Sequence, residues 1–497
     1  MKKFFPSILI TVFLIVVGFF FSYRITQTPP GLTTDEAAFA YNAALLEKTG
    51  HDQNGRFMPV FVLSINGADW RQPVSQYFIT AFFKIFGPSI FSLRLSTVVI
   101  LLLSTFLIYF WLSKIDNRQT GIIGSLVFLT TPIVMIQTHM ALDNIFPIPF
   151  ALLWLICLWY FSKTKKVSFL LFAGISLGIG FYTYKAMRAV VPVWCLLTVL
   201  FLFLENSHLT KKNITQFIKQ TLLFTLGIFP FFAIIPLLEL KYPGAVFDSH
   251  SFNWSSIYDF LYPYLSSFDL SFLFIKGDDL IYHSTGTHGM FLLSLLPVFL
   301  VGLYQGVREK GYWTFLIAVF FFTPLLFGFV DSVHRASRLM AFIPAFVAIT
   351  SLGIVTIKKL KNKFLAYFLL GVIVIISIFN YSSFVNYYWY TYPKFARSYF
   401  LPSNTLENAY VYLSQTAKRN HLIPYIESGA KLSDGETGKF FEAAYFDESL
   451  KLWQAEQPLP PNSIVMAKLG HQEHLVTIGS TIEEYNFFVN KGETIID

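Results

Sequence analysis

The stretch that decides the fold is the apolar run Phe4-Phe-Pro-Ser-Ile-Leu-Ile-Thr-Val-Phe-Leu-Ile-Val-Val-Gly-Phe-Phe-Phe21, which follows a basic start at Lys2 and Lys3. A helix needs about 20 predominantly apolar residues to cross the hydrocarbon core of a bilayer. No small-residue cleavage site follows the run, and further apolar runs come later in the chain. We therefore interpret it as an uncleaved first transmembrane helix and not as a signal peptide.

The composition of the whole chain is that of a membrane protein. Of the 497 residues, 54% are hydrophobic and 13% are charged, and the mean hydropathy is +0.55. Soluble proteins carry roughly 25% charged residues, so about half of the usual charge is missing. The net charge of +8 comes from short Lys and Arg clusters between apolar runs, a pattern that does not suggest nucleic acid. Cys157 and Cys195 both lie in apolar runs, so no disulfide framework is expected.

The apolar runs predict an all-α polytopic membrane protein with about 11 transmembrane helices. Basic clusters occupy alternate loops, which the positive-inside rule places in the cytoplasm. The loops 24–90 and 239–288 and the C-terminal region then face outward. The predicted spans are 4–23, 91–112, 119–138, 144–162, 168–183, 189–204, 218–238, 289–307, 312–330, 338–357 and 364–382.

The composition changes from about residue 400 onward, where acidic residues and polar turns appear. Helical patterning near 404–418 precedes two short β-like runs, Ser463–Ala467 and His474–Ile478. We therefore predict two domains, a transmembrane module at 1–382 and a small soluble extracytoplasmic α/β domain at 383–497. A region of about a hundred residues can form its own core.

An acidic pair, Asp35-Glu36, lies just outside the first apolar run, in the stretch Gly31-Leu-Thr-Thr-Asp-Glu-Ala-Ala-Phe-Ala-Tyr41. Ionisable groups at the membrane edge are costly and are therefore functional candidates. The same stretch is also a good helix start, with Thr33 or Thr34 as the cap. Catalysis and capping are both compatible with it.

Further candidate residues fall on the predicted outer side of the membrane. Cations at outer helix ends run against the positive-inside rule, and a bound lipid phosphate would explain them. Snorkelling to ordinary headgroups is the alternative. Asp143 could contact a sugar, position a base or cap a helix. The spacing of His283 and His288 is weak evidence for a metal site, so no metal ligands are assigned. The candidates are Asp143, Tyr182, Tyr184, Lys185, Arg188, Asp278, His283, His334, Arg335 and Arg338.

Taken in order along the chain, these motifs resemble the GT-C glycosyltransferases, and within them the protein O-mannosyltransferase and aminoarabinose-transferase-like (glycosyltransferase family 39-like) branch. Asp35-Glu36 matches the early extracytoplasmic Asp-Glu of that family. The resemblance covers about residues 1–380, and the region beyond about 400 is not matched. No Trp-Trp-Asp-Tyr-Gly element of oligosaccharyltransferase catalytic subunits occurs. The other matching positions are Pro73, Tyr77, Phe86-Gly87, Arg94-Leu95, Asp143, Tyr182, Tyr184, Arg188, Gly277-Asp278, His283, Pro297, His334-Arg335, Arg338-Leu339 and Pro344.

The resemblance implies the GT-C fold and transfer of a sugar, with inversion, from a polyprenyl-phosphate donor to an extracytoplasmic acceptor hydroxyl on a protein, lipid or envelope glycan. Such a transfer needs a base for the hydroxyl proton and cations for the departing phosphate. We predict Asp35 as the base and Glu36 as its orienting partner, although the two roles could be exchanged. We predict that the candidates listed above bind the phosphate and the sugar of the donor. No cofactor is assigned, and a divalent metal requirement stays open. The expected partners are donor, acceptor and membrane lipids.

We expect a multi-pass protein of the cell (plasma or inner) membrane, with its N-terminus in the cytoplasm and its active site and C-terminal domain outside. The main alternative is a transporter or flippase for lipid-linked glycans, which would tend to show paired halves and broken helices at mid-membrane. A non-catalytic scaffold that presents the C-terminal domain is a third interpretation. It leaves the outward acidic pair and arginines unexplained.

Overall fold

The computed structural model describes residues 5–206, 211–247, 256–329, 335–400, 403–454, 457–468 and 485–490. The chain forms two compact units, each assembled from separate segments. The first unit comprises Met1–Tyr23, Gln72–Ser75 and Thr97–Tyr392. The second comprises Arg24–Arg71, Gln76–Ser96 and Pro393–Asp497. The early segment that carries Asp35 therefore shares a unit with the C-terminal region.

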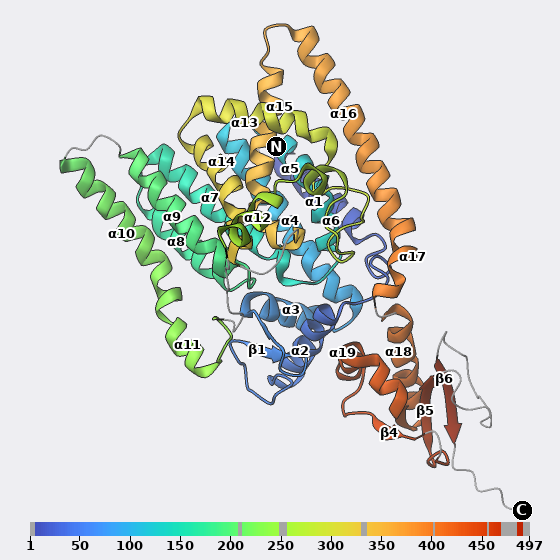
Figure 1. Ribbon diagram of the computed structural model, residues 1–497. Coiled ribbons are helices and arrows are strands. Elements are labelled where there is room, and N and C mark those ends of the chain that lie inside the picture. The colour runs from blue at the N-terminus through green and yellow to red at the C-terminus, as the bar shows by residue number, and fades with distance from the viewer. Residues whose placement is uncertain are drawn as a thin grey trace, which may run out of the picture. The chain divides into compact units, whose positions relative to one another are not determined.

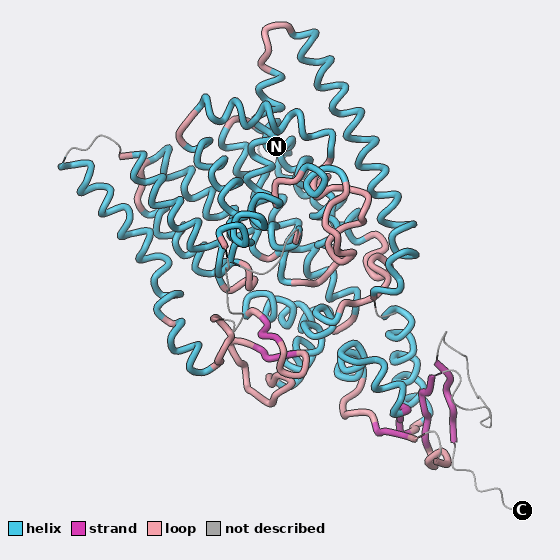
Figure 2. The backbone as a smooth tube through the Cα atoms, viewed as in Figure 1, coloured by secondary structure: helices cyan, strands magenta, loops and turns pink. Residues whose placement is uncertain are grey.

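Each apolar run predicted as a span coincides with one or more helices, shown in Figures 1 and 2. Among the described residues, seven helices are long and apolar enough to cross a membrane, or eight with one bent pair. The chain is a multi-span membrane protein, and the expected number of about 11 spans stays a prediction. The helices are α1 (Phe5–Ser22), α4 (Ile90–Ile115), α5 (Arg118–Leu129), α6 (Pro132–Thr138), α7 (Pro147–Thr164), α8 (Ser168–Phe181), α9 (Met187–Glu205), α10 (Lys211–Ala233), α11 (Ile235–Lys241), α12 (Ile257–Ser266), α13 (Leu296–Glu309), α14 (Tyr312–Phe322), α15 (Ile343–Lys358) and α16 (Lys363–Asn386).

Short helical turns complete this part of the chain and join or extend the longer helices. They are the 3-10 turns η1 (Asp143–Ile145), η3 (Leu293–Leu295), η4 (Thr323–Phe329) and η5 (Ala336–Phe342), and the π-helical turns η2 (Ser271–Ile275) and η6 (Tyr387–Thr391). Because η5 runs directly into α15, residues 336–358 form one apolar segment of 23 residues, most of which are buried. The start of η5 precedes α15, and side chains from other segments contact it.

The run predicted as one span at 119–138 is bent by 65° between α5 and α6. Pro132 stands at the start of α6, and Thr131 before it has an extended backbone (φ −76°, ψ 115°). A proline lacks the N–H that would continue the preceding helix and disfavours the helical conformation in the residue before it. The bend therefore follows from the position of one proline.

Helices α8 and α10 pack at a distance that leaves no room for side chains between them. A Cβ atom added at Gly174 of α8 would lie 2.2 Å from the carbonyl oxygen of Phe224, and one added at Gly227 of α10 would lie 2.2 Å from that of Leu171. Small residues that allow two backbones to approach closely are typical of helix pairs in membranes. Figure 1 shows the two helices side by side.

This packing predicts a large effect for a substitution in α10. Gly227→Val should destabilise the protein, because its new side chain would collide with backbone atoms of α8, which cannot move aside as a flexible side chain can. We expect a loss of about 1–3 kcal/mol, measured as a lower midpoint of thermal unfolding in detergent. The matched control is Gly371→Val in α16, where no atom lies within 4 Å of the added Cβ. Equal midpoints for the two variants would contradict the prediction.

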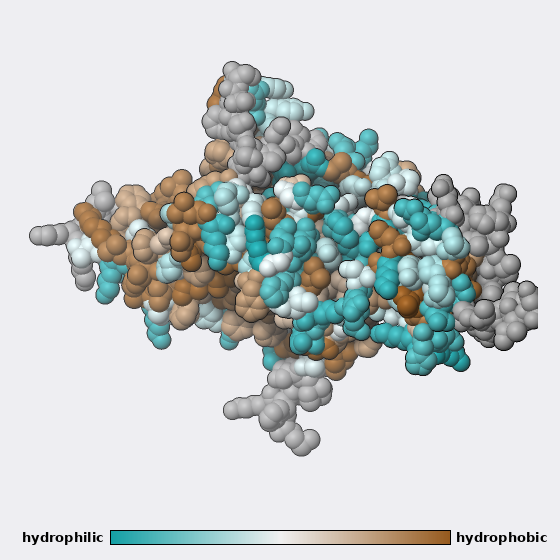
Figure 3. Space-filling model, turned by 90° about the horizontal axis from the view of Figure 1, so that it is seen from below, coloured by the Kyte–Doolittle hydropathy of each residue, from teal (hydrophilic) through white to brown (hydrophobic). Residues whose placement is uncertain are grey.

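One face of α10 and α11 carries large apolar side chains that the other described residues leave exposed. Leu222, Leu226, Phe229, Leu237 and Leu240 are between 58% and 82% exposed. Figure 3 shows hydrophobic residues gathered on the side of the molecule where α10 lies in Figure 1. A soluble protein rarely exposes so large an apolar surface, and contact with lipid hydrocarbon explains it.

The second unit contains all the strands that the structure describes, as Figure 2 shows. A short antiparallel hairpin, β1 (Val62–Ser64) and β2 (Asp69–Arg71), lies between α2 (Thr34–Thr49) and α3 (Pro73–Phe86). The C-terminal sheet has the order β4-β3-β5-β6, in which β3 pairs in parallel with β4 and β5, and β5 pairs antiparallel with β6. The C-terminal elements are α17 (Tyr392–Ala396), η7 (Arg397–Tyr399), α18 (Ser403–Asn420), β3 (Ile423–Glu427), α19 (Ser428–Tyr445), β4 (Lys451–Trp453), β5 (Ser463–Lys468) and β6 (Tyr485–Asn490).

The predicted α/β character of the C-terminal region is confirmed. The helical pattern near 404–418 forms α18, and the run Ser463–Ala467 forms β5, whereas His474–Ile478 lies outside the described residues. Trp453, Val465, Ala467 and Phe488 form the core of the sheet. Buried Asp434 of α19 accepts hydrogen bonds from the hydroxyls of Tyr410 (3.1 Å) and Tyr485 (2.7 Å), which ties α18, α19 and β6 together.

Candidate functional site

The acidic pair begins helix α2, as the sequence predicts. The Thr33 hydroxyl accepts a hydrogen bond from the Glu36 N–H at 3.1 Å, and the Glu36 carboxylate accepts one from the Thr33 N–H at 3.1 Å. This reciprocal capping box satisfies two N–H groups that have no partner inside the helix. It places Asp35 and Glu36 in the first turn, where the positive end of the helix dipole favours carboxylates.

Glu36 is committed to a buried ion pair. Its carboxylate lies 3.0 Å from Nε of Arg94, and neither side chain has any exposed surface. Nη2 of Arg94 also donates to this carboxylate at 3.3 Å, and the guanidinium donates to the backbone carbonyls of Ile25 (2.9 Å), Pro29 (3.1 Å) and Gly31 (2.5 Å). A buried charge is tolerated only when it is paired and hydrogen-bonded. Arg94 therefore fixes the segment that leads into α2 and the first turn of α2 at the same time.

Asp35 has a different environment from its neighbour. One carboxylate oxygen lies 2.9 Å from Nη2 of Arg71, whose side chain is 4% exposed, but 55% of the Asp35 side chain is exposed. Arg71 is itself held by Asp69 (3.2 Å), by the Ser64 hydroxyl (2.7 Å) and by the ring of Phe39 beneath it. A fixed cation thus orients an accessible carboxylate. Of the two acids, Asp35 is the accessible one.

In the first unit, several predicted donor-binding residues meet at the start of η5. Tyr184 shares hydrogen bonds with Ser337 and Arg338, and Asp143 and Arg338 act on it electrostatically. Burial raises the pKa of Tyr184 to about 12, and Asp143 adds to this rise while Arg338 opposes it. His283 lies 3.5 Å from the Ser337 hydroxyl through Nε2. The structure therefore brings together Asp143, Tyr184, His283 and Arg338, which are distant in the sequence.

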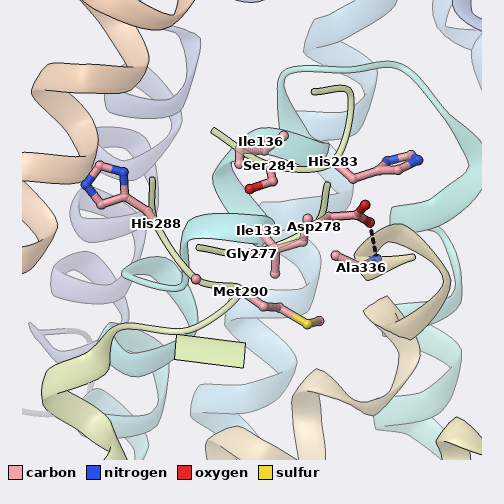
Figure 4. A pocket seen from close by; sticks show the side chains of 10 residues that line it. Ile133, Ile136, Gly277, Asp278, His283, Ser284, His288, Met290 and Ala336 are labelled. Atoms are coloured by element: carbon pink, nitrogen blue, oxygen red, sulfur yellow. Dashed lines mark hydrogen bonds between the residues drawn. The ribbon is translucent and has the colours of Figure 1, made fainter. Parts of the chain in front are cut away.

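Asp278 is tied to the same turn. Its carboxylate accepts hydrogen bonds from the N–H groups of Ala336 (2.7 Å) and Leu280 (2.9 Å), and Arg335 acts on it electrostatically. Figure 4 shows the bond to Ala336 at the edge of a small pocket. The pocket has no room for a water-sized molecule, so a lipid-linked sugar could enter it only after a rearrangement. It is lined by Ile133, Ile136, Gly277, Asp278, His283, Ser284, His288, Gly289, Met290 and Ala336.

The electrostatics of Asp278 predict a pH-dependent stability. Burial raises the pKa of Asp278 from 3.8 to about 6, against the two N–H donors and Arg335, which lower it. Between these values the folded chain keeps a proton that the unfolded chain loses, so stability falls as the pH rises from about 4 to about 6 and then stays level. The difference should amount to about 1–3 kcal/mol. Asp278→Asn should remove this slope from the midpoint of thermal unfolding, and an unchanged slope would contradict the assignment.

Two other predicted donor residues have structural hydrogen bonds. Arg188 donates to the carbonyl oxygens of Val246, at 2.9 Å, and of Ala245. The hydroxyl of Tyr182 donates to the carbonyl oxygen of Phe231 at 2.7 Å. These contacts give both side chains a role in the fold, and their roles toward a donor stay predictions. Lys185 is partly buried in the turn before α9, and His334 lies outside the described residues.

Sequence reasoning missed the groups that hold the candidates in place. Arg71, Arg94 and Ser337 have no assigned role in the sequence analysis, although Arg94 stands in a motif used for the resemblance. A single arginine in the first turn of an apolar helix needs a buried partner, and this signal could have linked Arg94 to an acidic residue. Within the described ranges, no group of three or more His, Cys, Asp or Glu side chains could hold a metal ion.

Comparisons with known proteins agree with this architecture. The model of the dolichyl-phosphate-mannose-protein mannosyltransferase family matches residues 71–235. An undecaprenyl phosphate-alpha-4-amino-4-deoxy-L-arabinose arabinosyl transferase of Proteus mirabilis is 23% identical over 309 residues, which cover 59% of this chain and 51% of the relative. The corresponding enzyme of Wigglesworthia glossinidia brevipalpis is 31% identical over 155 residues, 30% of this chain and 26% of that relative. The matched segments thus span about half of the first relative and about a quarter of the second.

Among solved structures, ArnT from Cupriavidus metallidurans in the apo state matches with a TM-score of 0.59 at 11% identity, covering 99% of both chains. The same protein bound to undecaprenyl phosphate matches with a TM-score of 0.55 at 10% identity, covering 98% of both. The fold and the comparisons together define a polytopic membrane protein with the GT-C fold. In particular, the chain has the fold of ArnT, and a small α/β region follows its transmembrane helices.

Proposed function

We propose that this protein is an integral membrane glycosyltransferase that moves a sugar from a polyprenyl-phosphate donor to the hydroxyl of an extracytoplasmic acceptor. The observation that carries the proposal is the contrast within the acidic pair. Asp35 is oriented by a buried arginine and remains accessible, whereas Glu36 is sealed in an ion pair. An accessible carboxylate held in one place is what a general base requires. The arabinosyl transferases that this chain resembles are named for an undecaprenyl phosphate donor.

In this proposal, the residues around η5 serve the donor. Arg338 and Arg335, with Lys185 and Arg188, would balance the negative charge that grows on the departing phosphate, because guanidinium groups match phosphate geometry with two parallel donors. Asp143 and Tyr184 would contact the sugar. The other predicted donor-binding residues are Tyr182, Asp278, His283 and His334. Glu36, which the sequence analysis pairs with Asp35 in catalysis, has the narrower role of fixing the start of α2.

We also propose how the chain is oriented in the membrane. The N-terminus and the Lys and Arg clusters between helices would face the cytoplasm, as the positive-inside rule requires. The loops 24–90 and 239–288 and the α/β region within 383–497 would face outward. Nucleotide-sugar donors are absent there, so a lipid-linked donor is the available source of activated sugar.

The proposal is tested with the purified full chain in lipid nanodiscs. Polyprenyl phosphates bearing different sugars are supplied together with envelope lipid, protein and glycan acceptors, and products are identified by mass spectrometry. We expect a mass increase of one sugar residue on one acceptor class and release of free polyprenyl phosphate in equal amount. Donor movement between leaflets without any glycosylated product would instead support a flippase.

A further inference from the structure

Glu407 of α18 caps the first turn of α4. Its Oε1 atom accepts hydrogen bonds from the Ile90 N–H at 2.9 Å and from the Tyr445 hydroxyl at 2.7 Å. Ile90 is the first residue of α4, so its N–H has no partner within that helix. The carboxylate also meets the positive end of the helix dipole. A side chain from the C-terminal region therefore fixes the start of a helix more than three hundred positions earlier in the chain.

The arginine that holds the acidic pair lies one helical turn after the capped residue. Arg94 lies four residues after Ile90, on the same face of α4. It binds the Glu36 carboxylate and the carbonyl oxygens before α2. Burial raises the pKa of the Glu407 carboxyl, and the positive charge of Arg94 opposes this rise. A displacement of the first turn of α4 would therefore move Arg94 and, with it, Glu36, the residue next to Asp35.

The other end of α2 is held by the same C-terminal region. Lys48, in the last turn of α2, donates to the Phe446 carbonyl oxygen at 2.5 Å and lies 3.7 Å from the carboxylate of Asp447. Helix α19 packs along α2, and Phe440 of α19 stacks on Phe83 of α3 with 5.9 Å between ring centroids. Both ends of the helix that carries Asp35 are thus fixed, directly or through Arg94, by residues of the C-terminal region.

We propose that the segment 403–447 is a positioning element for the transfer reaction, with Glu407 as a positioning residue that sets the place of Asp35. The inference rests on the proposed function only in so far as Asp35 is the base. Glu407 acts through Ile90 and Arg94 and does not itself touch the substrate. The C-terminal region therefore has a role within the catalytic machinery and is more than a separate binding module.

The test compares Glu407→Ala, Glu407→Gln and Tyr445→Phe in the full chain in nanodiscs. Both hydrogen bonds end on the same oxygen of Glu407, so the amide oxygen of Gln can accept them while the charge is lost. Tyr445→Phe removes a single hydroxyl and keeps the packing. Glu448→Gln is the matched control, because Glu448 is an exposed acid of the same region. Turnover, KM for the donor and amide hydrogen exchange across residues 33–49 are measured for each variant.

We expect Glu407→Ala to lower kcat by about 10–100-fold, since a displacement of about 1 Å at a reacting group costs that much, and to change KM for the donor less than twofold. Amides in the first turn of α2 should exchange at least about tenfold faster. Glu407→Gln should recover most of both effects, and Tyr445→Phe should give an intermediate result. Wild-type kcat in Glu407→Ala, or unchanged exchange in the first turn of α2, would overturn the inference.

The exchange measurement separates this inference from the proposed function. If Asp35→Asn retains full turnover, Asp35 is not the base, and faster exchange in Glu407→Ala would then support the structural coupling but overturn its catalytic meaning. If Asp35→Asn is inactive but Glu407→Ala has normal kcat and normal exchange, the proposed function stands and the positioning role fails. A global loss of folding in Glu407→Ala leaves Glu407→Gln and Tyr445→Phe to decide, because each makes a smaller change.

Discussion

Asp35→Asn should lower the turnover number of sugar transfer by about 10²–10⁴-fold, the range that general-base catalysis contributes. The amide has the size of the carboxylate, and its oxygen can still accept the hydrogen bond from Arg71, so the first turn of α2 should keep its structure. What is lost is the ability to take a proton from the acceptor hydroxyl. The measurement is single-turnover transfer in nanodiscs with a saturating polyprenyl-phosphate sugar, which separates chemistry from product release.

The control for this prediction lies in the same helix. Glu47→Gln removes an ion pair with Lys84 at 3.1 Å near the other end of α2 and leaves Asp35 and Arg71 unchanged. Its turnover should remain within about twofold of wild type, since exposed ion pairs contribute little. Binding of the donor to Asp35→Asn should also be nearly unchanged, because the base acts on the acceptor. A turnover within about threefold of wild type in Asp35→Asn would remove the base assignment.

Much of the fold could be predicted from the sequence because lipid imposes a simple rule. Every apolar run long enough to cross a bilayer has to satisfy its backbone within a helix, and the predicted spans do coincide with helices. The bend between α5 and α6 could also have been predicted, because Pro132 stands in the middle of one of these runs. The grouping of residues 24–71 and 76–96 with the C-terminal region could not, since it depends on side-chain contacts between distant segments.

The candidate site also combines features that could be predicted from the sequence with features that could not. The motif order predicted these residue types on one side of the membrane, which stays a prediction. In the structure, Asp143, Tyr184, His283 and Arg338 meet near η5. The sequence could not separate Asp35 from Glu36, because adjacent acids in one helical turn look alike in a pattern. Their difference arises from partners at positions 71 and 94, and only the folded chain shows which arginine each acid meets.

Arg94→Met should be among the most destabilising substitutions in the chain, at about 3–5 kcal/mol, because it leaves the buried carboxylate of Glu36 without a counter-charge. The double variant Glu36→Gln with Arg94→Met removes that charge and should recover part of the loss. It cannot recover all of it, because the carbonyl oxygens of Ile25, Pro29 and Gly31 would still lack the donors that Arg94 supplies. Thermal unfolding of the purified chain measures both variants against Lys84→Met, which breaks an exposed ion pair and should cost less than about 1 kcal/mol. If the double variant is as unstable as Arg94→Met, the lost carbonyl donors, and not the unpaired charge of Glu36, account for the destabilisation. If Arg94→Met itself loses no more stability than Lys84→Met, the buried pair does not hold the start of α2.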